Sequence, residues 1–70
     1  VLVTAHYEHI GIARAVDGAS INNGADDDAS GNVALLEIAR ALQNGPRPKR
    51  TILFISITGE EMGGIGTRWY

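Results

Sequence analysis

The stretch Thr51-Ile52-Leu53-Phe54-Ile55-Ser56-Ile57 is almost continuously apolar and rich in β-branched residues. Such a run predicts a strand that is covered on both faces, as in a parallel sheet. Near the start of the chain, Val1-Leu2-Val3-Thr4-Ala5 is a second run of this kind and predicts another buried strand. The two strands are separated by 45 residues or so, which is long enough for a crossover connection.

A helix is predicted inside that connection, from about residue 30 to residue 44. Its apolar residues recur at i, i+3, i+4 and i+7, the spacing of one helix face: Leu35, Ile38, Ala39 and Leu42. Asp28 and Ser30 are candidate N-caps, and Asn44-Gly45-Pro46 offers a left-handed residue followed by a helix breaker. Strand, helix and strand in this order predict a βαβ unit of an α/β fold. The residues from Tyr7 to Ala29 show little regular pattern and are expected to form a functional or disordered loop.

Composition narrows the class of protein. The 70 residues include no cysteine and four aromatic residues, so a self-sufficient small domain held by disulfides is excluded. A hydrophobic content of 44% with 20% charged residues is typical of globular proteins rather than disordered chains. We therefore expect residues 1–70 to be an internal fragment of a larger domain. No apolar run approaches the roughly 20 residues of a transmembrane helix. A net charge of −2 gives no general attraction to nucleic acid.

The βαβ geometry predicts where the charged residues meet. In a right-handed unit, the helix begins at the edge where both strands end, and ligands of open α/β sheets bind at that edge. Six of the eight acidic residues and both histidines are expected there: His6, Glu8, His9, Asp26, Asp27, Asp28, Glu60 and Glu61. Arg47, Lys49 and Arg50 are expected at the opposite edge. A bound cation is the simplest way to neutralise so many carboxylates, and a mixture of histidine and carboxylate favours zinc over calcium or magnesium.

Each of these features also has a purely structural interpretation. A single histidine such as His6 is more often a hydrogen-bonded structural residue than a metal ligand. The three aspartates alone can form a turn and a helix cap, and Glu60-Glu61 alone can be a solvated loop. Three separate segments converge on one predicted edge, however, and this convergence favours a metal site.

The motifs resemble one known family. Ala5-His6-Tyr7-Glu8-His9, Asn23 to Gly31, Leu35 to Arg40, Lys49 to Ile57 and Gly59-Glu60-Glu61-Met62-Gly63 are similar, in order and spacing, to the two-zinc aminopeptidases of the bacterial leucyl aminopeptidase type. The resemblance covers essentially the whole chain. It implies that residues 1–70 are a βαβ fragment of a three-layer α/β/α zinc-exopeptidase catalytic domain with a mixed, mostly parallel sheet.

The resemblance also implies roles for individual residues. His6 would ligate one zinc ion, Glu61 the other, and Asp26 would bridge both. Glu60 would be the general base that takes a proton from the metal-bound water. Glu8, where the family usually has aspartate, and Asp27 would hold the ligands in place. A cis peptide bond is implied between Asp26 and Asp27, and a further Asp and a further His are expected from outside the fragment.

The function implied is zinc-dependent removal of N-terminal residues from a peptide substrate by two zinc ions. The alternatives are a carboxypeptidase, a glutaminyl-cyclase-like enzyme or a non-catalytic scaffold homologue. The isolated fragment is expected to be inactive. Localisation cannot be inferred from the residues themselves, although the resemblance suggests a secreted or periplasmic protein.

Overall fold

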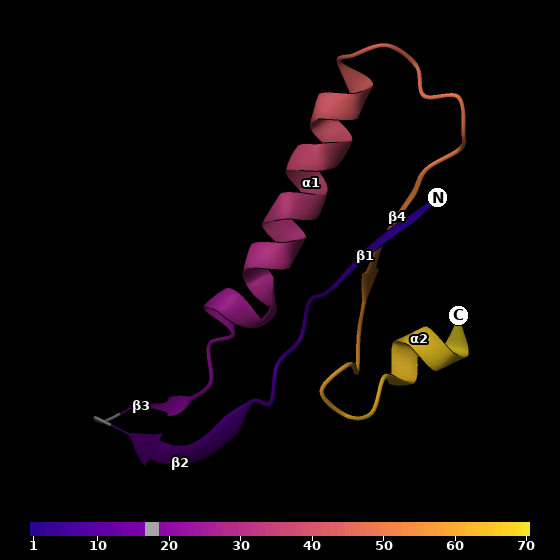
Figure 1. The fold of residues 1–70 in the computed structure, drawn as a ribbon. Coiled ribbons are helices and arrows are strands. Elements are labelled where there is room, and N and C mark those ends of the chain that lie inside the picture. Colours follow the sequence, from indigo (N-terminus) through magenta and orange to yellow (C-terminus); the bar gives the residue numbers. More distant parts are fainter. Residues whose placement is uncertain (17–18) are drawn as a thin grey trace.

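The computed structural model describes residues 1–16 and 19–70, and its centre is a parallel pair of strands (Figure 1). β1 (Leu2–His6) pairs with β4 (Leu53–Ile57), in a register that runs from Leu2 opposite Leu53 to His6 opposite Ile57. α1 (Ser30–Gln43) connects the two strands and packs against both of them. The α/β class and the βαβ unit predicted from the sequence are therefore confirmed.

The ends of α1 differ in detail from the prediction. The Asp28 carboxylate accepts a hydrogen bond from the Gly31 N–H (3.1 Å) and so satisfies one free donor of the first helical turn. At the other end, Asn44 has right-handed φ and ψ angles of −91° and −2°. Gly45 is not among the glycines with a positive φ angle either, so the predicted left-handed residue at this end of the helix is wrong. The helix ends instead with the Asn44 N–H bonded to the Arg40 carbonyl, directly before Gly45-Pro46.

The connection before α1 contains more regular structure than the sequence predicted. β2 (Ile12–Val16) and β3 (Ala19–Ile21) form an antiparallel pair with Ile12 opposite Ile21, and η1 (Ala25–Ala29) is a wide turn that leads into α1. The expectation of an irregular loop from Tyr7 to Ala29 is thus wrong for this hairpin. Two short strands have almost no periodicity of their own, and it is their pairing with each other that defines them.

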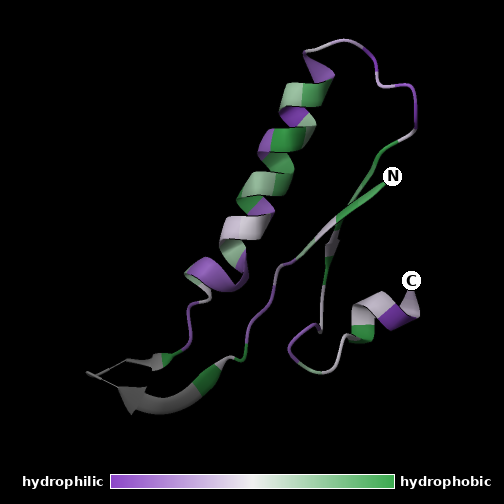
Figure 2. Ribbon diagram, in the orientation of Figure 1, coloured by the Kyte–Doolittle hydropathy of each residue, from purple (hydrophilic) through white to green (hydrophobic). Residues whose placement is uncertain are grey.

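The chain forms a thin layer of about 48 × 26 × 8 Å. Among the residues whose burial is described (1–12 and 21–70), the apolar residues that are buried are Ala5 and Leu35, on β1 and α1. Figure 2 shows apolar residues along β1 and in bands on α1, but Leu53 of β4 remains 47% exposed. The β4 strand is therefore not covered on both faces within these 70 residues. None of the helices in the described part of the chain is both long and apolar enough to cross a membrane.

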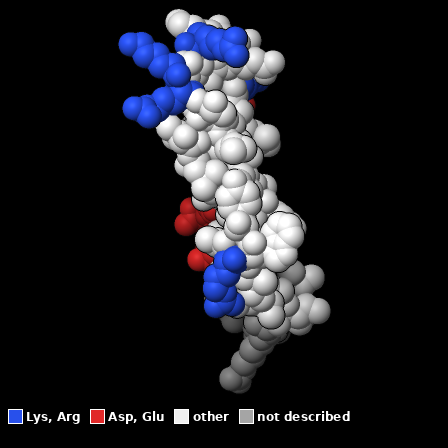
Figure 3. Space-filling model, turned by 90° about the vertical axis from the view of Figure 1, so that its right-hand side faces the viewer, with Lys and Arg blue, Asp and Glu red and all other residues white. Residues whose placement is uncertain are grey.

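The basic side chains of residues 47–50 lie at the end of the layer predicted for them. Figure 3 shows a group of basic side chains at the end where α1 finishes, and acidic side chains farther down the molecule, where a further basic side chain lies beside them. Arg47, Lys49 and Arg50 line a hollow of about 420 Å³ at this basic end. The last helix, α2 (Ile65–Trp69), follows a turn at Gly63-Gly64 on the acidic side. The carboxyl edge of the strand pair is therefore the place where acidic groups and histidines meet.

Candidate metal centre

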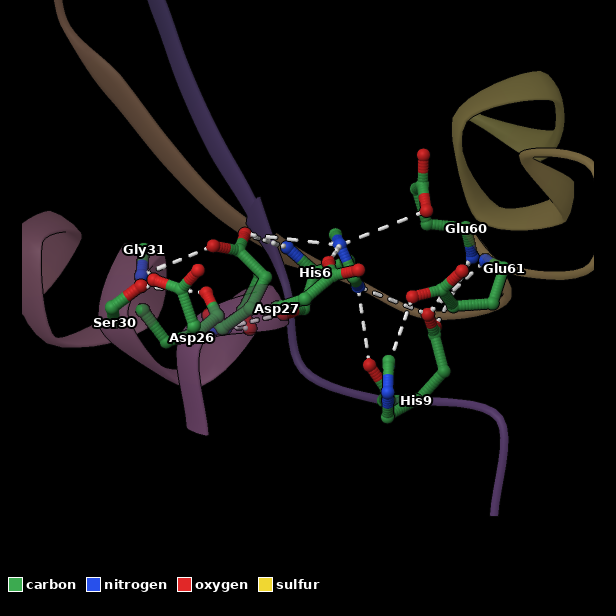
Figure 4. A network of polar contacts seen from close by, with 12 residues as sticks. His6, His9, Asp26, Asp27, Ser30, Gly31, Glu60 and Glu61 are labelled. Atoms are coloured by element: carbon green, nitrogen blue, oxygen red, sulfur yellow. Dashed lines mark hydrogen bonds and ion pairs between the residues drawn. The ribbon is translucent and has the colours of Figure 1, made fainter. Parts of the chain in front are cut away.

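The site lies where β1 and β4 end side by side. The pairing continues one residue beyond β1, because the Tyr7 N–H donates to the Ile57 carbonyl at 2.9 Å. The residues that follow the two strands therefore face each other across the sheet edge, and the turn before α1 approaches from the other side (Figure 4).

His6, the last residue of β1, has a defined tautomer. Its Nδ1 lies 3.1 Å from both the backbone carbonyl oxygen and the Oε1 carboxylate oxygen of Glu8. A carbonyl and an ionised carboxylate only accept hydrogen bonds, so Nδ1 must carry the proton. The Nε2 lone pair is then available to a ligand, which is the arrangement of a metal-binding histidine oriented by a carboxylate.

Glu8 also holds the turn after β4. Its carboxylate accepts from the Glu60 N–H at 3.1 Å and from the Glu61 N–H at 3.4 Å. Partial burial acts to raise the pKa of Glu8, but these backbone donors and His6 outweigh it, and the net effect lowers the pKa below its usual value. The longer side chain of glutamate, in place of the family's aspartate, thus reaches both His6 and the glutamate turn.

The turn that carries the two glutamates requires a glycine. Gly59 has a φ angle of +70°, which side chains rarely adopt, and a Cβ atom there would lie 2.9 Å from the Ile65 Cβ. This buried glycine lets the chain reverse directly after β4. Because of this reversal, Glu60 and Glu61 lie at the sheet edge beside the end of β1.

Carboxylates surround the free nitrogen of His6. Nε2 lies 3.0 Å from Asp27 Oδ1, 3.6 Å from Glu60 Oε2 and 4.0 Å from Asp28 Oδ2. Partial burial acts to lower the pKa of His6, but the Glu8 carbonyl and the nearby carboxylates outweigh it and raise this pKa above its usual value.

The three consecutive aspartates have different environments. Asp27 reaches His6, whereas Asp28 accepts hydrogen bonds from the backbone N–H groups of His6 (3.2 Å) and Gly31. The Asp26 side chain is exposed, and its backbone carbonyl accepts a hydrogen bond from the Ser30 hydroxyl at 2.7 Å. The structure thus brings Asp27, rather than Asp26, to His6.

The cis peptide bond also lies one residue later than expected. It joins Asp27 to Asp28, so the expectation of a cis bond between Asp26 and Asp27 is wrong. The backbone at Asp27 (φ −115°, ψ 88°) and at Asp28 (φ −134°, ψ 40°) is not helical. This departure from helical geometry separates the directions of adjacent aspartates, and sequence periodicity contains no signal for it.

Two overlapping groups of side chains have the spacing of metal ligands. His6, Glu60 and Glu61 form one group, and His9, Asp27 and Glu61 form the other, with the ligand atoms of each group within 4.8 Å of one another. Ligand atoms around one tetrahedral zinc ion, each about 2.0–2.2 Å from the metal, lie roughly 3.3 Å apart. The distances from His6 Nε2 to Asp27 and Glu60 are on either side of this value. The residues present therefore fit zinc.

Asn32 connects the segments of the site and was not singled out by the sequence. From the first turns of α1, its side-chain amide donates to the backbone carbonyls of His6 and Asp28, and its Oδ1 accepts from the Ser56 hydroxyl of β4 at 2.6 Å. One side chain thus joins both strands to the aspartate turn. The sequence did contain one indication of this role: Asn32 comes two residues after Ser30, in the first turn of the predicted helix, which is the turn nearest the sheet edge.

Comparison with known proteins identifies a family and several relatives of this chain. The model of peptidase family M28 matches residues 1–70. Aminopeptidase YwaD of Bacillus subtilis is 39% identical over 70 residues, which cover all of this chain and 13% of that protein. A probable glutamate carboxypeptidase (VP8) of Zea mays is 51% identical over 51 residues, 66% of this chain and 7% of that protein. Human transferrin receptor protein 2 is 41% identical over 69 residues, 91% of this chain and 8% of that protein.

The chain therefore spans only a small part of the length of each of these relatives. No solved structure gives a significant match. The family match covers every residue, and the resemblance found in the motifs is confirmed. The chain belongs to peptidase family M28, a family of zinc metallopeptidases.

Proposed function

We propose that the protein containing this chain is an aminopeptidase that uses two zinc ions to remove N-terminal residues from peptides. The observation that carries the proposal is the convergence of His6, Asp27, Glu60 and Glu61 from three segments on the carboxyl edge of β1 and β4. The Glu8 carboxylate supports it, because it holds His6 in the tautomer that a zinc ligand needs.

Zinc bound at this edge supplies a Lewis acid that polarises the scissile carbonyl and activates water. His6 offers Nε2 as a ligand, and Asp27 and Glu61 offer carboxylate oxygens on either side of it. We assign the shared, bridging position to Asp27 in place of Asp26, because Asp27 Oδ1 lies 3.0 Å from His6 Nε2 and Asp27 is within ligand distance of Glu61. The remaining Asp and His ligands implied by the family resemblance would come from outside these 70 residues.

Glu60 is proposed as the general base. Its carboxylate is about half exposed and lies 3.6 Å from His6 Nε2, so it is adjacent to the ligands and remains accessible to water and substrate. A carboxylate in this place can take a proton from the attacking water and later pass it to the leaving amine. Glu61, whose side chain is only 20% exposed, is better placed to hold metal.

Two other functions have support from individual relatives. The carboxypeptidase relative has the higher identity, but its match covers 51 residues, whereas the aminopeptidase match covers all 70. The relative named a receptor raises the alternative of a non-catalytic domain. The presence of His6, Glu60 and Glu61 within ligand distance of one another, with Asp27 within ligand distance of Glu61, favours an enzyme over that alternative.

The test uses the full-length protein and two matched peptides. One has a free N-terminus and an amidated C-terminus, and the other has an acetylated N-terminus and a free C-terminus. We expect hydrolysis of the first peptide only, loss of activity after chelation, and recovery when zinc is added. Hydrolysis of the second peptide alone would indicate a carboxypeptidase. A protein that binds zinc and cleaves neither peptide, or binds none, would contradict the proposal.

A further inference from the structure

His9 has a place in this site that none of the assigned roles explains. It lies three residues after the end of β1, and its Nδ1 is 2.9 Å from Oε1 of Glu61, which is 52 residues away along the chain. Both side chains are shielded, with 22% and 20% of their surfaces exposed. Figure 4 shows His9 extending from its own segment toward the turn that carries Glu61.

The direction of this hydrogen bond follows from the chemistry of the two groups. An ionised carboxylate has no proton to donate, so the Nδ1 of His9 must donate and Glu61 must accept. One of the two carboxylate oxygens of Glu61 is thereby held, and the rotation of the carboxylate about its last bond is restricted. The remaining oxygen, Oε2, is then presented in a fixed direction.

His9 is itself held by the turn that carries the aspartates. A Cβ atom on Gly24 would lie 3.0 Å from the Cβ and 3.2 Å from the Cγ of His9, and 2.9 Å from the backbone oxygen of Asp27. Gly24 has a φ of +66°, and its carbonyl accepts a hydrogen bond from the Ala29 N–H, which closes this turn. The backbone at Gly24 therefore packs directly against His9 and ties its position to the segment of Asp27.

We infer that His9 is a positioning residue that fixes the Glu61 carboxylate relative to Asp27 and thereby sets the affinity of the site for zinc. The inference rests on the proposed function, because it requires Glu61 to be a zinc ligand. His9 links the two loops that carry the carboxylate ligands, and His9, Asp27 and Glu61 lie within ligand distance of one another. Partners that hold metal ligands in this way contribute strongly to metal affinity.

The test is a pair of substitutions with similarly branched side chains in the full-length protein. His9→Asn keeps an N–H donor at nearly the position of Nδ1, whereas His9→Leu has a similar size and no donor. We expect His9→Leu to weaken zinc binding by about 10–100-fold and His9→Asn to stay within about threefold of the unmodified protein. Zinc affinity is measured by competition with a chromophoric chelator, and thermal melting of the metal-free proteins checks that both variants fold. Ile10→Ala, on the adjacent exposed residue, is the control and should not change the affinity.

A double-mutant cycle with Glu61→Gln isolates the contact between the two side chains. If His9 acts through Glu61, His9→Leu should weaken zinc binding much less in the Glu61→Gln background than in the unmodified protein. Equal losses for His9→Asn and His9→Leu would overturn the inference, since they would indicate that the imidazole ligates zinc or only packs. No loss in either variant would overturn it as well. If one of these contrary results is found in a protein that still binds zinc and cleaves peptides, only the inference about His9 is overturned and the proposed function survives. If the unmodified protein binds no zinc, both the inference and the proposed function are refuted.

Discussion

Replacement of Asp27 should remove zinc from the site, whereas replacement of Asp26 should not. The Asp27 carboxylate lies 3.0 Å from the free nitrogen of His6, whereas Asp26 belongs to neither group of candidate ligands, although both side chains are exposed to solvent. Asp27→Asn and Asp26→Asn make the same chemical change on adjacent residues. Each is therefore the control for the other, and the comparison tests the position that the structure assigns to the bridging ligand.

The size of each effect follows from Coulomb's law. A pair of unit charges about 4 Å apart contributes about 4 kcal/mol at an effective dielectric constant of about 20. Loss of the Asp27 charge beside the cation should therefore weaken zinc binding by roughly 10³-fold. Asp26 belongs to neither group of candidate ligands, so its charge acts on the cation from farther away and through water, where a pair of unit charges contributes only about 1 kcal/mol even at 4 Å. We therefore expect a change of less than about fivefold for Asp26→Asn.

Both affinities are measured in the full-length protein by titration of zinc against a chromophoric chelator. Melting of the metal-free variants checks that neither substitution disrupts the turn before α1. The reasoning is refuted if Asp26→Asn loses zinc and Asp27→Asn keeps it, because the bridging ligand would then be Asp26, as the family resemblance implied.

Three further predictions concern the glutamates, the pH dependence and the stability of the fragment. Glu60→Gln should keep zinc and lower kcat by roughly 10²–10⁴, as expected for loss of a general base. Glu61→Gln should lose zinc and regain activity in excess metal. If metal analysis finds zinc lost in the Glu60 variant and kept in the Glu61 variant, the two roles are exchanged. In the metal-free protein, the Glu8 carbonyl and the nearby carboxylates outweigh the effect of partial burial and raise the pKa of His6 above its usual value. Zinc competes with the proton for this ring, so zinc affinity should fall as the pH drops through the pKa of His6. An NMR titration that finds this pKa below its usual value would contradict the prediction. The isolated 70-residue chain should melt without a cooperative transition, because Ile12 and Trp69 are 81% and 88% exposed and little apolar surface is buried. A sharp melting curve by circular dichroism would show instead that the isolated chain folds alone.

The sequence by itself determined the βαβ unit and the edge at which the site lies. The apolar run of β4 and the helical spacing of Leu35, Ile38 and Leu42 are local patterns, and a right-handed crossover then leaves one arrangement of the strand ends. His6 and the two glutamates are placed by counting from the ends of β1 and β4. They could therefore be predicted, because His6 ends β1 and the glutamates come three and four residues after β4, and parallel strands end at the same edge of the sheet.

Only the tertiary structure decided which aspartate meets His6 and which residue holds Glu61. Asp26, Asp27 and Asp28 are chemically identical in the sequence, and their directions depend on non-helical backbone angles that no periodicity encodes. The hydrogen bond from His9 to Glu61 and the hydrogen bonds that link Asn32 to His6 and to Ser56 join residues 24 to 52 positions apart. Such contacts depend on how the turns pack around Gly24 and Gly59, and this packing exists only once β1, β4 and α1 are assembled.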